Sequence, residues 1–512
     1  MRMDTAKLQR NVANIRERWR VEDLKWPWLP KPCTVRILCY ADFPGAYDGG
    51  PFDGLKHVLA TLASDPYFWI TFKVTRASRT NDTSADVNYR SKTLDQLNLS
   101  ADFDEVWFFG LGGQPNQLSA AEISAMQSFM DQGGGVLMTG DHEDLGAAIG
   151  SAIPRAGKMR SWSPADAPAF GPEHHSTLRA GHDLGYVFND QSDDVPQTIR
   201  YRRYPLPSWA WWQLRSAPHP VLCGPDGPLN VLPDHMHEGL VTIPVSFPAG
   251  EWPSKSGFQP KPQVIAWAKI EEPGLTVSGT EFPVIGAYDG HRADVGRIVA
   301  DATWHHWFDI NLIGESGAVI GDTAGFDVPT GLAALKKIEA YFLNVAIWLA
   351  PPAKQSCMRN RLWWGALWRD PLVMMSPRHP VFLLGLSGKD AMGKYAPQCT
   401  VHRFISEIID IHLQLRLDDL RLKGVPHPPL LEESIFGVAL QRLLEYAQER
   451  GIPEKVEDEE VDRLIEWALD AAVPEGLRAA SELASYVANT GHELLSALDR
   501  RDFEPSNDAQ QL

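Results

Sequence analysis

Residues 119–140 read SAAEISAMQSFMDQGGGVLMTG, and this stretch decides the fold. Ser119 and Glu122 have the S-x-x-E spacing of a capping box, in which each side chain satisfies a free backbone N–H at the start of a helix. Apolar side chains then recur at helical spacing, namely Ile123, Met126, Phe129 and Met130. Three glycines at 133–135 end the helix, and residues 136–140 return as a buried strand. The stretch therefore predicts a helix-to-strand crossover of a parallel sheet.

Similar patterns continue on both sides of this unit. Short apolar runs predict buried strands at 35–39, 70–75, 106–110, 264–269, 282–288 and 296–302, and helical stripes occur at 54–62 and 332–349. Alternating elements of this kind are typical of an α/β domain with a doubly wound parallel sheet, which we place at residues 33–352. Residues 150–260 lose the alternation and are rich in Pro, Trp, His and Gly, so we interpret them as a long insertion. Residues 1–32 are expected to form an N-terminal helical arm.

The remaining residues, 353–512, follow Pro351 and Pro352 and are expected to be mainly helical. Helical stripes cover 401–420, 430–450, 458–472 and 476–498. The stripes are wide for solvated helices, and exposed apolar faces of that kind mark interfaces. We therefore expect this region to pack on the α/β domain or on a second subunit, which makes a homo-oligomer the expected assembly.

Composition narrows the class of protein. The chain has 512 residues, 44% of them hydrophobic, and a formal net charge of −17. That charge excludes a general nucleic-acid binder, because binding phosphates requires a basic face. The one basic cluster is Arg-Tyr-Arg-Arg at 200–203, interpreted first as a solvated loop. Neither a signal peptide nor an apolar run long enough to span a bilayer is apparent, so no membrane partner is expected.

Five cysteines are spread along the chain at positions 33, 39, 223, 357 and 399. The number is odd, the spacings are wide and no C-x-x-C pair occurs. This pattern favours reduced thiols over a disulfide framework, and it predicts a cytoplasmic protein.

The chemistry is expected where the strands end. In open parallel sheets, ligands bind at the carboxyl ends of the strands, at the point where the strand order reverses. The candidate catalytic residues there are Asp141, His142, Glu143, Asp301 and His305, and the candidate substrate-binding residues are Asp42, Gly112, Gly113, Gln114 and His306. Two alternatives remain open: 110–113 is either a tight turn or a set of substrate-facing amides, and 141–144 is either a polar helix start or a catalytic segment. Of the adjacent His305 and His306, at most one faces the site.

Histidine clusters in the insertion suggest a metal. His174 and His175 follow Glu173, and His235 and His237 lie two residues apart beside carboxylates. Imidazole and carboxylate are ligands of zinc, the metal we expect if one is bound, although histidine pairs also occur as ordinary loop residues. The candidate ligands are His142, His174, His235 and His237. No nucleotide cofactor is expected, because 110–113 lacks the G-x-G-x-x-G spacing and 385–390 departs from a phosphate loop.

Two stretches resemble a known superfamily. The residues GGGVLMTG at 133–140 before Asp141, and the stretch from Pro283 to His305, resemble class I glutamine amidotransferase-like proteins, and are closest to the ThuA-like (trehalose-utilisation) branch. The resemblance covers about residues 33–350 and implies a flavodoxin-like sheet. Amidotransferases of this class carry a nucleophilic cysteine in a G-x-C-x-G elbow after this strand. Here Gly140 is followed by Asp141, so thiol chemistry on glutamine is not expected.

Two functions are compatible with this predicted fold and these candidate residues. In the first, the protein is a hydrolase-like enzyme that acts on a small polar substrate, such as a sugar derivative or an amide, through an acid/base or metal site. In the second, the α/β domain is a catalytically silent ligand-binding or scaffold module, and the C-terminal helices mediate assembly.

Overall fold

The computed structural model describes residues 30–47, 53–64, 66–140, 144–162, 197–205, 216–224, 227–232, 240–269, 281–302, 307, 312–314, 325–329, 331–370, 372, 375–413, 430–450 and 457–499. The expected N-terminal arm lies almost entirely outside these residues.

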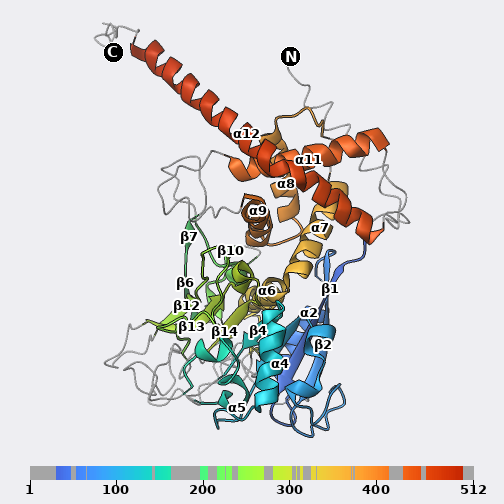
Figure 1. The fold of residues 1–512 in the computed structure, drawn as a ribbon, viewed down its shortest axis with the longest axis vertical. Coiled ribbons are helices and arrows are strands. Elements are labelled where there is room, and N and C mark those ends of the chain that lie inside the picture. Colours follow the sequence, from blue (N-terminus) through green and yellow to red (C-terminus); the bar gives the residue numbers. More distant parts are fainter. Residues whose placement is uncertain are drawn as a thin grey trace.

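One eight-stranded sheet forms the centre of the α/β region, in the order β2-β1-β3-β4-β14-β13-β12-β6 (Figure 1). The first five strands of that order run parallel. Their bounds are β1 (Cys33–Ala41), β2 (Ile70–Ser78), β3 (Glu105–Phe109), β4 (Gly135–Met138) and β14 (Ile298–Asp301). Every residue of β3, β4 and β14 is buried, as expected for parallel strands inside a layered fold.

The crossover unit forms as its sequence predicts. The hydroxyl of Ser119 accepts the N–H of Glu122 at 3.2 Å, and the carboxylate of Glu122 accepts the N–H of Ser119 at 2.9 Å. This capping box starts α4 (Ala120–Asp131). Gly133 ends it with a φ of 95°, a conformation that other residues rarely adopt.

The other end of the sheet is antiparallel, so the expectation of a wholly parallel sheet was wrong there. The strands β13 (Glu281–Tyr288), β12 (Gln263–Lys269) and β6 (Arg200–Tyr201) pair antiparallel in succession from β14. Buried apolar runs look the same in either direction, so their sequences did not reveal the orientation.

The expected insertion supplies the edge strand β6 and several short antiparallel pairs. These are β5 (Gln197–Thr198) with β11 (Val231–Leu232), β7 (Tyr204–Pro205) with β8 (Ser216–Ala217), and β9 (Cys223–Gly224) with β10 (Gly227–Pro228).

Helices cover the sheet. The helices α2 (Asp53–Ala63) and α6 (Leu332–Leu349) contact each other, and α6 also contacts β4 and β14. In Figure 1, α4 lies in front of the sheet. The remaining short helical segments are Leu94–Gln96, α3 (Leu99–Asp102), α5 (Ala147–Gly150), Ala156–Lys158, Pro220–Leu222 and Gly290–Ala293.

The C-terminal region is helical, as predicted. It contains α7 (Pro352–Arg369), α8 (Val381–Gly393), α9 (Gln398–Leu413), α11 (Leu431–Arg450) and α12 (Asp458–Asp499). The sequence did not predict α7 and α8. The two helices expected at 458–472 and 476–498 are one helix with Pro474 inside it. Figure 1 shows the end of α12 extending away from the rest of the molecule.

Two disulfides join the helical region to the α/β region. Cys33 on β1 pairs with Cys357 on α7, and Cys223 on β9 pairs with Cys399 on α9, each with a Cα–Cα distance of 6.0 Å. The prediction of five reduced thiols was therefore wrong, because distance along the chain says nothing about distance in the fold. Disulfides are typical of oxidising compartments, so the cysteines no longer support the predicted cytoplasmic location.

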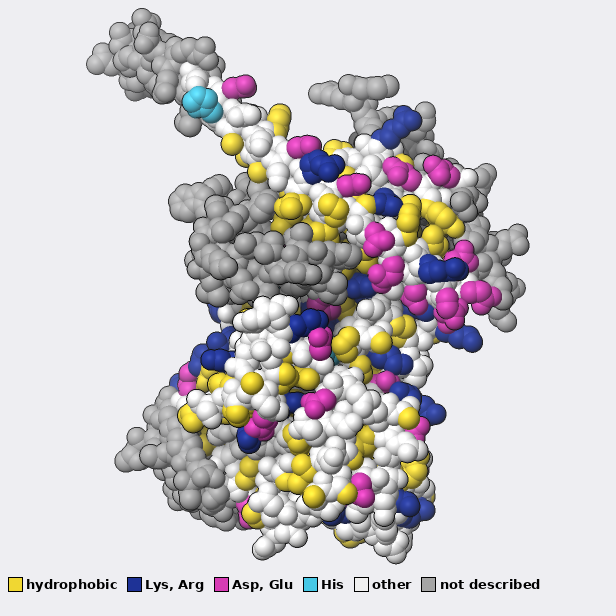
Figure 2. Space-filling view, in the orientation of Figure 1, with side chains coloured by type: hydrophobic (Ala, Val, Ile, Leu, Met, Phe, Trp, Pro, Cys, Tyr) yellow, Lys and Arg dark blue, Asp and Glu magenta, His cyan; other side chains and the backbone are white. Residues whose placement is uncertain are grey.

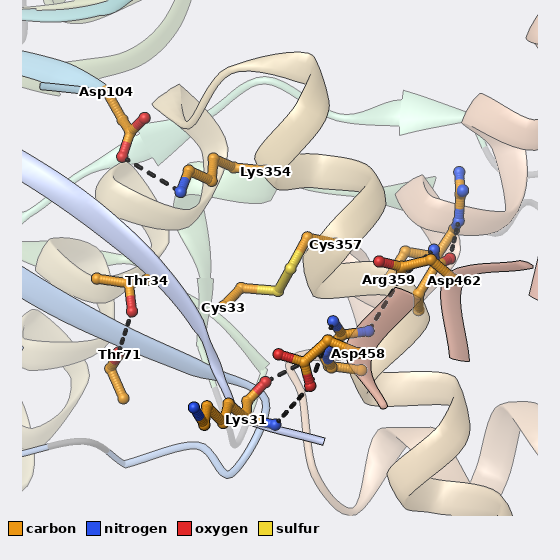
Figure 3. Close-up of a disulfide and its surroundings, with 12 residues drawn as sticks. Lys31, Cys33, Thr34, Thr71, Asp104, Lys354, Cys357, Arg359, Asp458 and Asp462 are labelled. Atoms are coloured by element: carbon orange, nitrogen blue, oxygen red, sulfur yellow. Dashed lines mark hydrogen bonds and ion pairs between the residues drawn. A yellow bond between two sulfur atoms is a disulfide. The ribbon is translucent and has the colours of Figure 1, made fainter. Parts of the chain in front are cut away.

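Ion pairs surround the first disulfide (Figure 3). The Nζ of Lys354 lies 3.7 Å from a carboxylate oxygen of Asp104, on the strand side of the contact. On the helical side, the guanidinium of Arg361 donates to Asp462 of α12 at 2.9 Å and to the carbonyl of Lys31 at 3.1 Å. These contacts place the start of β1 against α7 and α12.

A buried cation makes a second polar connection between the two regions. Arg297, before β14, donates to Asp289 and to Glu407 of α9, both at 2.8 Å, and its side chain is only 3% exposed. Among the residues described, no helix is both long enough and apolar enough to cross a membrane.

Candidate functional site

The carboxyl ends of four neighbouring parallel strands lie at one edge of the sheet. The order β1-β3-β4-β14 makes these strands direct neighbours. Contacts between the segments that follow them connect the whole edge. The segments after residues 39, 110, 140 and 301 begin at this edge, as the strand order requires. The cleft expected between them involves Asp141 and His305, which lie outside the described residues, so it stays a prediction.

Asp42 occupies the first position of this edge, directly after β1. Its carboxylate accepts the backbone N–H groups of Leu111 at 2.7 Å and Gly112 at 3.1 Å. Asp42 is therefore held by the turn that follows β3. Desolvation raises the pKa of this half-buried carboxyl, although the two backbone bonds act in the opposite direction.

Glycines make the close packing of this edge possible. A Cβ atom on Gly112 would lie 2.7 Å from the Cβ of Ala148 and 3.0 Å from a carboxylate oxygen of Asp42. A Cβ on Gly113 would lie 2.7 Å from a carboxylate oxygen of Asp144. Two carboxylates, Asp42 and Asp144, therefore lie close to the backbone of this turn. Gln114, the next predicted residue, is exposed.

Arg160 is a residue at this edge that the sequence analysis missed. Its side chain is buried, and its guanidinium donates to the carbonyls of Ser161 at 2.7 Å and Ala302 at 3.2 Å. A Cβ on Gly140 would lie 2.7 Å from the guanidinium carbon, so Arg160 lies directly against the end of the β4 segment. It also stacks on Trp162 at 4.6 Å. Arg160 thus connects the segments that follow β4 and β14.

Asp301 lies at the end of β14 and is fully buried. One of its carboxylate oxygens accepts the indole N–H of Trp307 at 3.0 Å and the hydroxyl of Tyr341 at 2.7 Å. Burial, followed by the charge of Asp301, raises the pKa of Tyr341 well above its usual range. Asp301 therefore faces the core beneath the edge.

All of the other predicted site residues lie outside the described residues: Asp141, His142, Glu143, His174, His235, His237, His305 and His306. Within the described ranges, no group of three or more His, Cys, Asp or Glu is arranged to hold a metal ion. The zinc prediction depends on histidines beyond those ranges and stays a prediction.

Cysteine chemistry has little basis at this edge. Four cysteines are paired in disulfides, and Cys39 is buried within β1. Burial raises the pKa of the Cys39 thiol to about 12, so the thiolate that a nucleophile requires is strongly disfavoured near neutral pH.

Comparison with known proteins gives little further information. Neither a family model nor a curated protein matches this chain. One solved structure is similar: a crystal structure at 2.30 Å resolution of a protein from Bacteroides uniformis that carries the provisional description ThuA-like. It is 13% identical, the similarity covers 61% of this chain and 91% of that one, and the TM-score is 0.25.

Proposed function

We propose that this chain is a hydrolase-like enzyme that acts on a small polar substrate, such as a sugar derivative or an amide, at the carboxyl edge of its parallel strands. The observation that carries the proposal is the contact between Asp42 and the turn at 110–113. In that contact Asp42, a partly desolvated carboxylate, binds the N–H groups of Leu111 and Gly112, and a second carboxylate, Asp144, lies beside Gly113 of the same turn.

The strand order supports this position. The five parallel strands follow the order β2-β1-β3-β4-β14, which corresponds to the 2-1-3-4-5 order of flavodoxin-like sheets. In such sheets the order reverses between the first and third strands, and ligands bind in the crevice at that point. Asp42 follows β1 and the turn follows β3, so the two flank this reversal. We propose on this basis a flavodoxin-like domain of the ThuA-like type without a nucleophilic cysteine.

The residues have separate roles in this proposal. Asp42 orients the substrate or the attacking water. One group among Asp141, His142, Glu143 and His305 takes a proton from water as the water oxygen attacks the scissile carbon. A second group donates a proton to the leaving oxygen or nitrogen, so the products are neutral. Asp301 positions the end of β14, and Gly112, Gly113, Gln114 and His306 contact the substrate.

A bound metal would change how the attacking water is activated. If His142, His174, His235 and His237 approach one another, three of them could hold a zinc ion that lowers the pKa of a bound water. Elemental analysis of the purified protein tests this version separately. His142→Ala or His235→Ala should remove the metal without unfolding the protein.

Activity measurements test the proposal itself. The substrates to assay are a panel of sugar derivatives and amides. We expect His142→Ala to lower kcat/KM by about 100-fold or more, and Asp42→Asn to lower it by about tenfold or more. Asp470→Asn and His492→Ala, on the exposed face of α12, are matched controls that should retain full activity. Unchanged kcat/KM in both site variants would contradict the proposed site.

The scaffold alternative is supported by one observation. The helix α12 leaves large apolar side chains exposed, with Tyr486 68% and Val487 53% accessible to solvent. If the protein is a scaffold, replacing these exposed apolar side chains of α12 should change the oligomeric state, and no compound of the substrate panel should be turned over.

A further inference from the structure

The basic cluster at 200–203 forms part of a concave site. β6 is the last strand of the sheet, and its residues line a cavity of about 530 Å³. The lining residues that matter here are Thr198, Arg200, Tyr201, Arg203, Asn230 and Lys337. They come from three separate parts of the chain: the insertion around β6, the segment before β11, and α6. The sequence had suggested a solvated loop at this place.

Contacts hold the arginines in position. The Nε of Arg200 donates to both carboxylate oxygens of Glu281 at 2.8 Å, and its guanidinium lies 4.0 Å from the centre of the Trp267 ring. Arg202 donates to the carbonyl of Val264 at 2.7 Å and lies 5.5 Å from the same ring. Arginine stacked on an aromatic face loses fewer degrees of freedom when it binds a ligand.

Two cations at the cavity have no acidic partner among the described residues. Arg203 lies 5.8 Å from the ring of Tyr201, and the Nζ of Lys337 donates to the side-chain oxygen of Asn230 at 3.2 Å. The backbone of Asn230 is held in place, because its main-chain carbonyl accepts the N–H of Ile199 at 2.9 Å. Glu281 is the one carboxylate that pairs with any of these cations in the described ranges. The local charge is thus positive in a chain with a net charge of −17.

Protection of an edge strand is the simpler explanation for charges on β6, since charged side chains prevent strands from pairing with other molecules. It explains Arg200 on the strand, but it does not explain why Lys337 of α6 and Asn230 line the same cavity. Figure 2 shows dark-blue side chains gathered on the side of the molecule where Figure 1 places β6 and β12.

We propose that this cavity binds a small molecule that carries a phosphate group. Arg203 and Lys337 would bind the phosphate oxygens, with Asn230 and Thr198 as further polar contacts. Guanidinium and ammonium groups are the usual partners of phosphate, and the adjacent ring of Tyr201 would contact the remainder of the ligand. Six steps between strands separate β6 from β1, a distance of about 29 Å, so this site is independent of the function proposed above.

Calorimetric titration with inorganic phosphate tests the inference, with sodium chloride at equal ionic strength as the reference. We expect one saturable site. Arg203→Gln and Lys337→Gln should each raise Kd about tenfold or more, since each removes a charge-assisted hydrogen bond. Arg203→Lys should bind with intermediate affinity, because lysine keeps the charge and loses the planar fork. Thermal unfolding of each variant verifies that it folds.

Matched controls come from the opposite edge of the sheet and from α12. Lys73→Gln on β2 and Arg463→Gln on α12 remove the same charges at exposed positions and should leave Kd unchanged. Asp42→Asn should also bind phosphate normally, which separates this test from the proposed catalytic site. Equal weakening by the control variants, or no binding up to about 10 mM phosphate, would overturn the proposal. A labelled single-stranded oligonucleotide that binds at Arg203 when phosphate does not would overturn the small-ligand assignment.

Discussion

The pKa values of two buried carboxyl groups, Glu105 and Glu122, are shifted in opposite directions. Glu105 on β3 has no charged partner among the described residues: Trp107 donates to one oxygen at 2.9 Å, and the other oxygen has no hydrogen bond. Burial raises the pKa of Glu105 well above its usual range. Glu122 is also buried, but Arg79 and the N–H of Ser119 bind its carboxylate and lower its pKa despite the opposing effect of desolvation.

Glu105→Gln should therefore stabilise the protein at alkaline pH. The native state of the wild type favours the protonated form of Glu105. The contribution of this group to the free energy of unfolding is therefore fully present below its unfolded pKa of about 4.3, and it is lost as pH rises toward the folded pKa. Glutamine does not ionise, and the variant should gain about 1 kcal/mol or more over the wild type at pH 8. Denaturant unfolding at pH 4 and pH 8 measures the difference. A variant less stable than the wild type at pH 8 would contradict this account.

Glu122→Gln is the contrasting variant. A lowered folded pKa contributes stability above the unfolded pKa, and this stability is lost as pH falls through the folded pKa. The variant should lose about 2 kcal/mol at pH 7 because the bond to Arg79 is charge-assisted. The difference in the free energy of unfolding between variant and wild type should decrease as the pH is lowered.

Part of the site could be predicted one residue at a time. Asp42 and the turn at 110–113 were found because each directly follows a predicted strand. Arg160 follows no strand in the sequence, and only tertiary contacts with Gly140 and Ala302 bring it to the edge. Asp301 follows a strand too, yet the indole of Trp307 and the hydroxyl of Tyr341 hold it in the core, which periodicity cannot reveal.

Among the elements, strands with buried runs were predicted closely, and α6 has the predicted bounds of 332 and 349. α8 was missed because Gly385 and Gly388 lower helix propensity. In the structure these glycines allow close approach to α11: a Cβ on Gly385 would collide with the backbone of Glu433, and one on Gly388 with Leu440. Tertiary packing therefore outweighed the local preference of this segment.

Pro474 made α12 look like two helices. It is exposed within the continuous helix, where its ring removes one backbone hydrogen bond. Packing on α11 compensates for this loss. Pro474→Ala should therefore raise the free energy of unfolding, by up to about 3 kcal/mol. Thermal unfolding measures the change, with Glu475→Ala as the neighbouring exposed control. A lower melting temperature in Pro474→Ala would show that the proline sets a bend the fold requires.

For the whole molecule, the disulfides predict a definite thiol count. Denatured protein without reductant should titrate as one thiol, from Cys39, and after reduction as five. Cys357→Ser and Cys399→Ser should each destabilise the protein by up to about 5 kcal/mol, because each releases a long loop in the unfolded chain. Limited proteolysis should then cut more readily near α7 or α9. Five thiols before any reduction would contradict the pairing.

The end of α12 should mediate self-association. Residues 481–499 are mostly exposed where described, Tyr486 and Val487 among them, and Figure 1 shows the end of α12 extending away from the rest of the molecule. Tyr486→Asp with Val487→Asp should lower the mass measured by ultracentrifugation to that of a monomer. Glu482→Asp with Glu493→Asp, on the same segment, should leave the mass unchanged. A wild type that sediments as a monomer at all concentrations would exclude this interface.

The pairing of Cys33 with Cys357 has a consequence for biosynthesis. The two residues are 324 positions apart, so the ribosome delivers Cys357 long after the strands of the sheet. Cys39 and Cys223 emerge earlier, and neither is the native partner of Cys33. Residues 33–352 by themselves hold three cysteines, none of which pairs natively with another. A fragment cut at the apparent domain boundary would thus leave two thiols without their partners, and oxidation before α7 is synthesised would favour a wrong bond.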